Sequence, residues 1–224
     1  MTVLSFAKGV TRWRQIAESL SQDVAEARFL TPDELECLAS AIEPRYRAMV
    51  LVMAWGTLRI GEAIGLRRSD INLDAGTIRI ENNAVQVLGR PIEGPPKTKA
   101  GRRSMTLPSS VVDDLGAHLE RQPGSKYVFG PSGQRPLLAD DWRLRPWRRA
   151  VLATELGPLR PHDLKHTGVA LLALAGVDPL EIARRAGHTS VAFTYDRYGH
   201  LFPEIDKQAA QKLERVRPSS RDRP

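Results

Sequence analysis

The hydrophobic pattern of the chain changes its period twice, and this restricts the fold more than any other feature. Apolar residues recur at helical spacing up to about residue 66 and again from residue 109 onwards. Between these regions, residues 77–80, 84–88 and 103–107 alternate apolar and polar side chains, as short strands do. The sequence therefore predicts an α+β protein, mainly α-helical, with a small antiparallel β-sheet near the middle.

Proline, glycine and capping residues mark the ends of the predicted helices. Thr31, Pro32 and Glu34 carry the signature of a capping box, with proline at the first helical position. Gly56 ends a second helix, and Gly187 ends a later one. One predicted helix opens at Thr31, and the others cover about residues 45–55, 60–66, 109–121, 140 onwards, 161–175, 179–186, 190–198 and 203–216. The stretch 89–101, rich in Gly, Pro and Lys, is predicted as a long connection between strands.

The chain divides into one folded region and two terminal segments. Residues 29–216 are expected to form a single domain, preceded by an approach segment or remnant linker over 1–28 that holds a candidate helix at 13–27. Residues 217–224 are expected to be a disordered basic tail. The longest apolar run, 48–55, is too short to cross a membrane. The single cysteine excludes intrachain disulfides, and we expect a cytoplasmic protein.

The chain is basic, with a formal net charge of +7, and its cations are 26 Arg against only 7 Lys. Because the guanidinium group binds phosphate with two parallel hydrogen bonds, this composition is typical of proteins that bind nucleic acid. A genome that favours arginine codons would produce the same bias. Charge alone therefore leaves both interpretations open.

Four of the five histidines fall between residues 162 and 200. His162, Lys165 and His166 are spaced so that they share one helix face. This cluster has three interpretations, namely a zinc site, an exposed polar face and a site for phosphate chemistry. The zinc motif of this spacing needs Glu where Asp163 stands, which disfavours metal. Imidazole and ammonium groups on one face suit phosphate oxygens and proton transfer.

Two further motifs favour phosphate chemistry. Arg59 lies in apolar surroundings, where a buried cation needs an anionic partner such as Glu62 or a phosphate. Downstream, His188 precedes Tyr198 by ten residues across a predicted helix, so the imidazole can lie near the phenol. Neighbouring cations favour the phenolate, the form that attacks phosphorus, because an isolated phenol has a pKa of about 10.

Together, these three motifs resemble the boxes of tyrosine recombinases of the phage integrase family, over about residues 29–205. The first box, G-x-R-x-x-E-x-x-x-L, is met by residues 56–66 with one extra residue before the arginine. The second, H-x-L-R-H-T, is met by 162–167. The third, L-G-H followed by Y-x-H, is met by residues 187–188 and 198–200. The resemblance implies the fold of the family's catalytic domain.

The resemblance implies a role for each matching residue. Arg59 binds the scissile phosphate, Lys97 protonates the leaving 5′-oxygen, His162 and His188 hydrogen-bond the phosphate, and Tyr198 is the nucleophile. Attack by the phenol gives a 3′-phosphotyrosine and a free 5′-hydroxyl, without metal, ATP or other cofactor.

The same resemblance bears on four further residues. Glu62 braces Arg59, and His166 supports the second box from behind. Tyr195 is the rival nucleophile, three residues before Tyr198, but it is more typical of a packing residue. Lys165 stands where the family has Arg and is assigned to the catalytic set. Lysine keeps the positive charge but cannot form the bidentate hydrogen bonds that arginine makes to a phosphate. Lys165 therefore indicates a slow, adapted or engineered site.

The expected partner is double-stranded DNA that carries a recombination site. The protein is expected to be a monomer free in solution and a tetramer on synapsed DNA, with DNA-bending or directionality factors as accessories. Residues expected to contact the DNA backbone are Lys99, Arg102, Arg143, Arg145, Arg148 and Arg149, with Trp142 and Trp147 in the core. Family members usually carry an N-terminal DNA-clamping domain, so the chain is read as a fragment or a short form. Two alternatives are a catalytically weak or inactive DNA-binding relative and a type IB topoisomerase-like enzyme.

Overall fold

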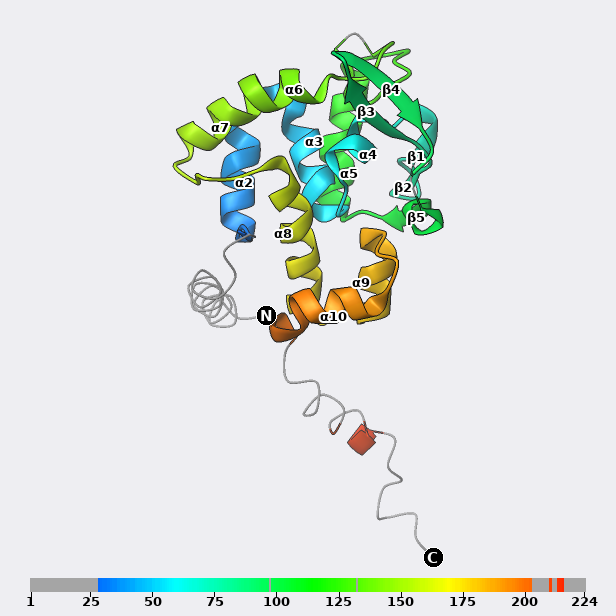
Figure 1. Ribbon diagram of the computed structural model, residues 1–224, viewed down its shortest axis with the longest axis vertical. Coiled ribbons are helices and arrows are strands. Elements are labelled where there is room, and N and C mark those ends of the chain that lie inside the picture. Colours follow the sequence, from blue (N-terminus) through cyan, green and yellow to red (C-terminus); the bar gives the residue numbers. More distant parts are fainter. Residues whose placement is uncertain (1–27, 97, 132, 203–209, 211–212, 216–224) are drawn as a thin grey trace, which may run out of the picture.

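The computed structural model describes residues 28–96, 98–131, 133–202, 210 and 213–215 (Figure 1). The candidate helix at 13–27, Lys97, most of the predicted helix from Pro203 and the C-terminal tail lie outside the described residues. Within them, the observed fold is helical with short antiparallel strands in the middle of the sequence, as the change of hydrophobic period predicts.

Three helices form the first part of the fold, each beginning where the sequence predicts. Helix α2 (Pro32–Ala41) starts with the predicted capping box, in which Glu34 N donates to Thr31 Oγ1 and Thr31 N donates to Glu34 Oε2. Helix α3 (Pro44–Trp55) ends at Gly56, and α4 (Ile60–Ile64) follows directly after Arg59. Helix α3 is buried on nearly all sides, so it forms the centre around which the other elements pack.

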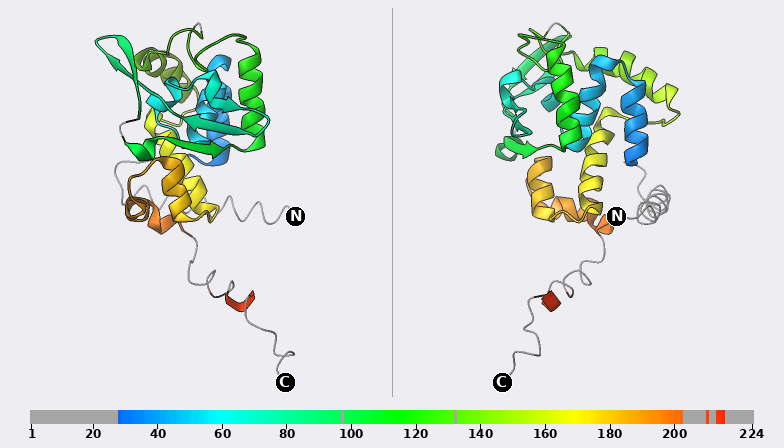
Figure 2. Two further views of the ribbon diagram at one scale, coloured as in Figure 1. Left: turned by 90° about the vertical axis from the view of Figure 1, so that its right-hand side faces the viewer. Right: turned by 180° about the vertical axis from the view of Figure 1, so that it is seen from behind.

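The strands form two separate antiparallel sheets, where the sequence predicted one. Strands β1 (Ile71–Asn72), β2 (Thr77–Ile80) and β5 (Arg103–Thr106) pair in the order β1-β2-β5. The second sheet is the hairpin of β3 (Asn83–Val87) and β4 (Arg90–Gly94), which extends away from the body of the protein (Figure 2).

Strand β4 lies in the segment predicted as a connection, so that prediction was wrong for residues 90–94. The strand was not predicted because the segment contains Pro91 and Gly94, and both residue types are depleted in strand interiors. The two-residue turn between β3 and β4 needs positive φ at both positions, and Leu88 (φ 47°) and Gly89 (φ 74°) provide it. Leucine is an unusual residue for such a turn, so the sequence carried no clear hairpin signal.

The second half of the chain is helical. Its elements are α5 (Ser109–Glu120), α6 (Ala139–Trp142), the π-helical turn η3 (Arg143–Trp147), α7 (Arg148–Ala153), α8 (Pro161–Leu174), α9 (Pro179–Ala186) and α10 (Val191–Tyr198). The short 3₁₀ turns are η1 (Arg68–Asp70), η2 (Lys99–Gly101) and η4 (Gly199–Leu201). Pro146 lies inside η3, where the missing N–H of proline accounts for the irregular turn.

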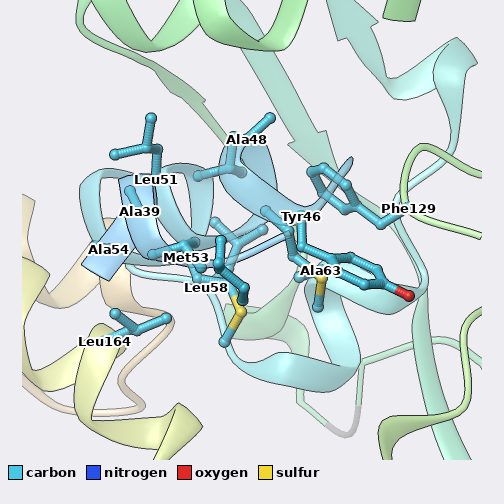
Figure 3. Close-up of a cluster of buried hydrophobic side chains, with 14 of the residues drawn as sticks. Ala39, Tyr46, Ala48, Leu51, Met53, Ala54, Leu58, Ala63, Phe129 and Leu164 are labelled. Carbon is cyan, nitrogen blue, oxygen red and sulfur yellow. The ribbon is translucent and has the colours of Figure 1, made fainter. Parts of the chain in front are cut away.

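Two hydrophobic cores meet along α8. The main core surrounds α3, and Leu164 from the first half of α8 reaches it (Figure 3). A smaller cluster, the satellite core, lies between the second half of α8 and helices α9 and α10. Its buried members are Val169, Ala170, Ala173, Ile182, Ala186, Tyr198 and Leu201. Helix α8 therefore connects the main body of the protein to the α9–α10 lobe, which lies directly below that body in Figure 1.

Gly168 of α8 packs directly against the backbone of Ala54 in α3. A Cβ atom there would lie 1.9 Å from the backbone oxygen of Ala54, so Gly168→Ala forces the two helices apart. We expect this change to lower the free energy of unfolding by about 3 kcal/mol in urea denaturation. Gly116→Ala in α5 is the matched control, because its Cβ meets only Leu73 at 3.8 Å and alanine favours a helix. If Gly168→Ala and Gly116→Ala had the same free energy of unfolding, the tight contact between α8 and α3 at Gly168 would be contradicted.

Candidate active site

Three segments that are distant in sequence meet at the C-terminal end of α9. Arg59, between α3 and α4, donates from Nη2 to the carbonyl oxygen of Gly187 at 3.4 Å. Lys165, in the second turn of α8, donates from Nζ to the carbonyl oxygen of Ala186 at 2.6 Å. The residues of the three sequence motifs are therefore brought together around one helix end.

Arg59 is held in place by Glu62. The backbone N–H of Arg59 donates to Glu62 Oε2 at 2.9 Å, and Arg59 Nη1 donates to Oε1 at 3.0 Å. The arginine side chain remains 41% exposed, whereas that of Glu62 is 3% exposed. Glu62 therefore anchors the guanidinium from the protein side and leaves part of it open to solvent, as a phosphate ligand requires.

Arg103 is a member of this site that the sequence analysis missed. Its side chain is 2% exposed, and Nη1 and Nη2 donate to Oε1 and Oε2 of Glu62 at 3.0 and 2.8 Å. Burial raises the pKa of the Glu62 carboxyl, but the hydrogen bonds and charge of Arg103, joined by those of Arg59, outweigh burial and bring that pKa below its ordinary value. The signal in the sequence was the inward position of Arg103, two residues before the buried Met105.

Three consecutive carbonyl groups at the C-terminal end of α9, those of residues 185–187, each accept a hydrogen bond from a basic side chain. Such carbonyls have no partner within the helix and lie at the negative end of its dipole. The pairs are Arg103 Nε with Arg185 O, Lys165 Nζ with Ala186 O, and Arg59 Nη2 with Gly187 O. Gly187 adopts the left-handed conformation (φ 62°) that turns the chain there. The helix end thus gathers three basic side chains at one place.

His162 and His188 flank these cations. Burial and the charge of Lys165 lower the pKa of both rings, that of His188 to about 4. Both imidazoles are therefore neutral near pH 7. A hydrogen bond of 2.9 Å joins His188 Nδ1 to Thr194 Oγ1, which fixes the ring and leaves Nε2 for another group. Neutral, oriented imidazoles suit hydrogen bonding to phosphate oxygens.

Tyr198 is buried at the end of α10, with 1% of its surface exposed. Its hydroxyl and His166 Nδ1 form a hydrogen bond of 2.5 Å. Burial raises the pKa of Tyr198 to about 12, and burial together with the charge of His162 lowers the pKa of His166 to about 3. The phenol and the imidazole are thus both neutral in this structure.

Tyr195 differs from Tyr198 in its surroundings. It is 44% exposed, and its ring lies 5.6 Å from that of Phe202. The expectation that Tyr195 is a packing residue fits the Phe202 contact but not the exposure. His200 follows Tyr198 in η4 and is exposed.

The residues predicted to bind DNA lie on the surface. Lys99 and Arg102 are exposed in and after η2, whereas Lys97 lies outside the described residues. Four exposed arginines lie on η3 and α7, namely Arg143, Arg145, Arg148 and Arg149. Arg143 pairs with Asp140 at 2.8 Å, and Arg149 lies 3.9 Å from Glu43. Trp142 and Trp147 are buried in the main core, as predicted.

Comparison with known proteins agrees with this arrangement. The Phage integrase family matches residues 28–204, which is most of the chain. The chain belongs to the phage integrase family. Among curated relatives of this integrase-family chain, the putative prophage phiRv2 integrase of Mycobacterium tuberculosis H37Rv is 32% identical over 202 residues, covering 88% of the chain and 54% of the relative. The integrase of Mycobacterium phage L5 is 31% identical over 206 residues, covering 88% and 55%. The chain thus spans about half the length of these relatives.

Solved integrases share the fold. The Tn1549 transposon integrase in complex with circular intermediate DNA matches with a TM-score of 0.70 at 21% identity, over 90% of this chain and 71% of that one. The catalytic domain of bacteriophage HP1 integrase matches with a TM-score of 0.58 at 18% identity, over 89% of this chain and 100% of that one. The predicted fold class is confirmed. Among the described residues, no helix has the length and apolar character needed to span a membrane.

Proposed function

We propose that this integrase-family chain is the catalytic part of a site-specific DNA recombinase, which cleaves and rejoins strands through a 3′-phosphotyrosine. The observation that carries the proposal is the convergence of Arg59, Lys165 and His188 on the C-terminal end of α9. On the neighbouring helix α10, the hydroxyl of Tyr198 is hydrogen-bonded to His166 of α8. The names of the relatives, which are integrases, support it.

The cationic side chains would act on the scissile phosphate. Arg59 offers its solvent-facing N–H groups to non-bridging oxygens, while His162 and His188 contribute neutral imidazoles. Donors fixed in advance stabilise the charge that grows on these oxygens in the five-coordinate transition state. Glu62 and Arg103 would not touch DNA; they hold Arg59 in position.

The tyrosine would supply the nucleophile. The phenolic oxygen of Tyr198 attacks phosphorus, the bond from phosphorus to the 5′-oxygen breaks, and Lys97 protonates that oxygen. The phenolic proton passes to a neutral imidazole nearby. Because Tyr198 is buried and its pKa is high, its side chain must leave the satellite core and approach the cations before it reacts. Rejoining reverses these steps, so the reaction consumes no external energy source.

The proposed partner is double-stranded DNA carrying a recombination site. By resemblance to the family, the protein would be a monomer free in solution and a tetramer on synapsed DNA in the cytoplasm, and it would respond to DNA-bending or directionality factors. A buried phenol and two neutral imidazoles beside a cluster of cations favour this function over a DNA-binding relative without catalysis.

The test is to incubate the protein with nicked suicide duplexes drawn from the DNA flanking its own gene and to run a denaturing gel. A recombinase gives a protein–DNA adduct and a strand with a free 5′-hydroxyl. A mobility shift without an adduct would support the DNA-binding relative instead. Relaxation of supercoiled plasmid without a specific site would support the topoisomerase alternative.

The exposed arginines of η3 and α7 are expected to contribute through phosphate contacts. The double variant Arg145→Gln, Arg148→Gln removes two cations, so binding should weaken equally on all sequences. The slope of log K against log salt should fall by about 1.8, since each phosphate contact contributes about 0.9. Arg184→Gln is the matched control, because Arg184 is exposed but paired with Glu181. If the double variant left the salt dependence of binding unchanged, the DNA would not contact these two arginines.

A further inference from the structure

Lys165 is a buried cation without a carboxylate partner in the described part of the chain. Its side chain is 3% exposed and donates one hydrogen bond, to the carbonyl oxygen of Ala186. The nearby carboxylate of Glu62 is occupied on both oxygens by Arg103 and Arg59. A buried ammonium that lacks a counterion is unfavourable, and such groups respond by losing their proton.

The charges that face Lys165 make its own charge still less favourable. The charges that act on Lys165 directly are those of Arg59 between α3 and α4, Glu62 on α4 and Arg103 on β5. The titratable groups on which Lys165 acts in turn are His162 and His166 of its own helix α8, and His188 directly after α9. Burial, followed by the charge of Arg59, lowers the pKa of Lys165 to about 7, and the attraction of Glu62 offsets this only in part.

We propose that Lys165 is neutral in much of the free protein near neutral pH and takes up one proton from solvent when a DNA phosphate occupies the site. The inference rests on the proposed function, because it assigns a phosphodiester as the anion. The neutral Lys165 amine has a free lone pair, which accepts one proton from solvent, and the resulting ammonium donates to Ala186 O and to a non-bridging phosphate oxygen. The negative phosphate is the missing counterion.

Lysine gives this position a property that arginine cannot give. A guanidinium stays protonated at every accessible pH, so an arginine here would be a permanent cation. With lysine, the third cation at the end of α9 forms only when an anion arrives or when the pH falls. The phosphate-binding strength of the site therefore depends on pH in the neutral range, and the Lys165→Arg variant should lose this dependence.

A direct test measures the proton on Lys165 by NMR of the full chain labelled at its lysines. The Lys165 resonance is assigned as the one that is missing from the spectrum of Lys165→Arg. Lys165→Met is a second variant that gives the same assignment if Lys165→Arg fails to fold. Most lysines should titrate near 10.4, whereas Lys165 should titrate near neutral pH. Sulfate serves as the anion probe, because its charge is constant in this range, and bound sulfate should raise the pKa of Lys165.

Titration of Lys165 together with the other lysines would overturn the proposal, as would a pKa that bound sulfate leaves unchanged. The second measurement is single-turnover cleavage of a suicide duplex, at DNA concentrations far below saturation so that the rate reports the free protein. Between pH 7 and 9 the wild-type rate should fall about tenfold or more beyond any fall in that of Lys165→Arg, because Lys165 loses its proton over this range.

The two proposals fail in different ways. If the proposed function is wrong, neither protein forms an adduct, while the NMR titration still reports the proton on Lys165. If the Lys165 inference is wrong, both proteins form adducts with the same pH dependence.

Discussion

Replacing Tyr198 by Phe is expected to abolish covalent attachment to DNA while leaving the affinity for the duplex within about twofold. The variant lacks the only atom that the proposed mechanism joins to phosphorus. The cations that would bind phosphate, Arg59 and Lys165, depend on Glu62 and the end of α9 rather than on the phenol, so they stay in place. The measurement is a denaturing gel with a nicked suicide duplex, run beside a mobility-shift titration.

The variant should fold, since phenylalanine preserves the packing of the satellite core. It loses the hydrogen bond to His166, which costs about 1 kcal/mol. Tyr195→Phe is the matched control, because Tyr195 carries the same group in the same helix but is half exposed. It should cleave at the wild-type rate. An adduct that survives in Tyr198→Phe and disappears in Tyr195→Phe would assign the nucleophile to Tyr195.

The position of Tyr198 gives one side chain two roles. In this structure it is a buried member of the satellite core, with its ring 6.0 Å from that of Phe29. In the proposed reaction the same phenol must reach the phosphate. Whatever exposes Tyr198 therefore removes apolar surface from burial, so the reaction begins with a cost in stability.

The features that the sequence predicted well are those fixed by neighbouring residues. The capping box of Thr31 and Glu34, the start of α8 at Pro161 and the turn at Gly187 each depend on interactions within a few positions. The motif residues Arg59 and Glu62 are likewise only three positions apart. Such spacing allows geometry to be deduced from the sequence alone.

The features that the sequence missed depend on distant contacts. Arg103 and Glu62 are 41 positions apart, so nothing local revealed that they pair. The bond from Lys165 to Ala186 spans 21 positions, and only the packing of α9 against α8 shows that the lysine is buried. The division into two cores depends on where α8 crosses its neighbours, which hydrophobic periodicity does not specify.

Glu62→Gln is expected to be the most destabilising conservative change near the site. Glutamine keeps the shape of the side chain but removes the negative charge that Arg103 and Arg59 share. Arg103 is then a fully buried cation without a counterion, which typically costs 3–5 kcal/mol. We expect a loss of about that size in the free energy of unfolding, measured by urea denaturation at pH 7.

Glu181→Gln is the control for this change, because Glu181 pairs with Arg184 at a similar distance on the exposed face of α9 and should cost about 0–1 kcal/mol. The pH dependence gives a second readout. The pKa of Glu62 is lowered on folding, so the unfolded chain binds more protons, and wild-type stability is lost as the pH falls below about 4. Glu62→Gln should lack this part of the acid transition. If instead both glutamate variants lost equal stability, the buried pair would add nothing beyond a surface pair, and Arg59 would need another anchor.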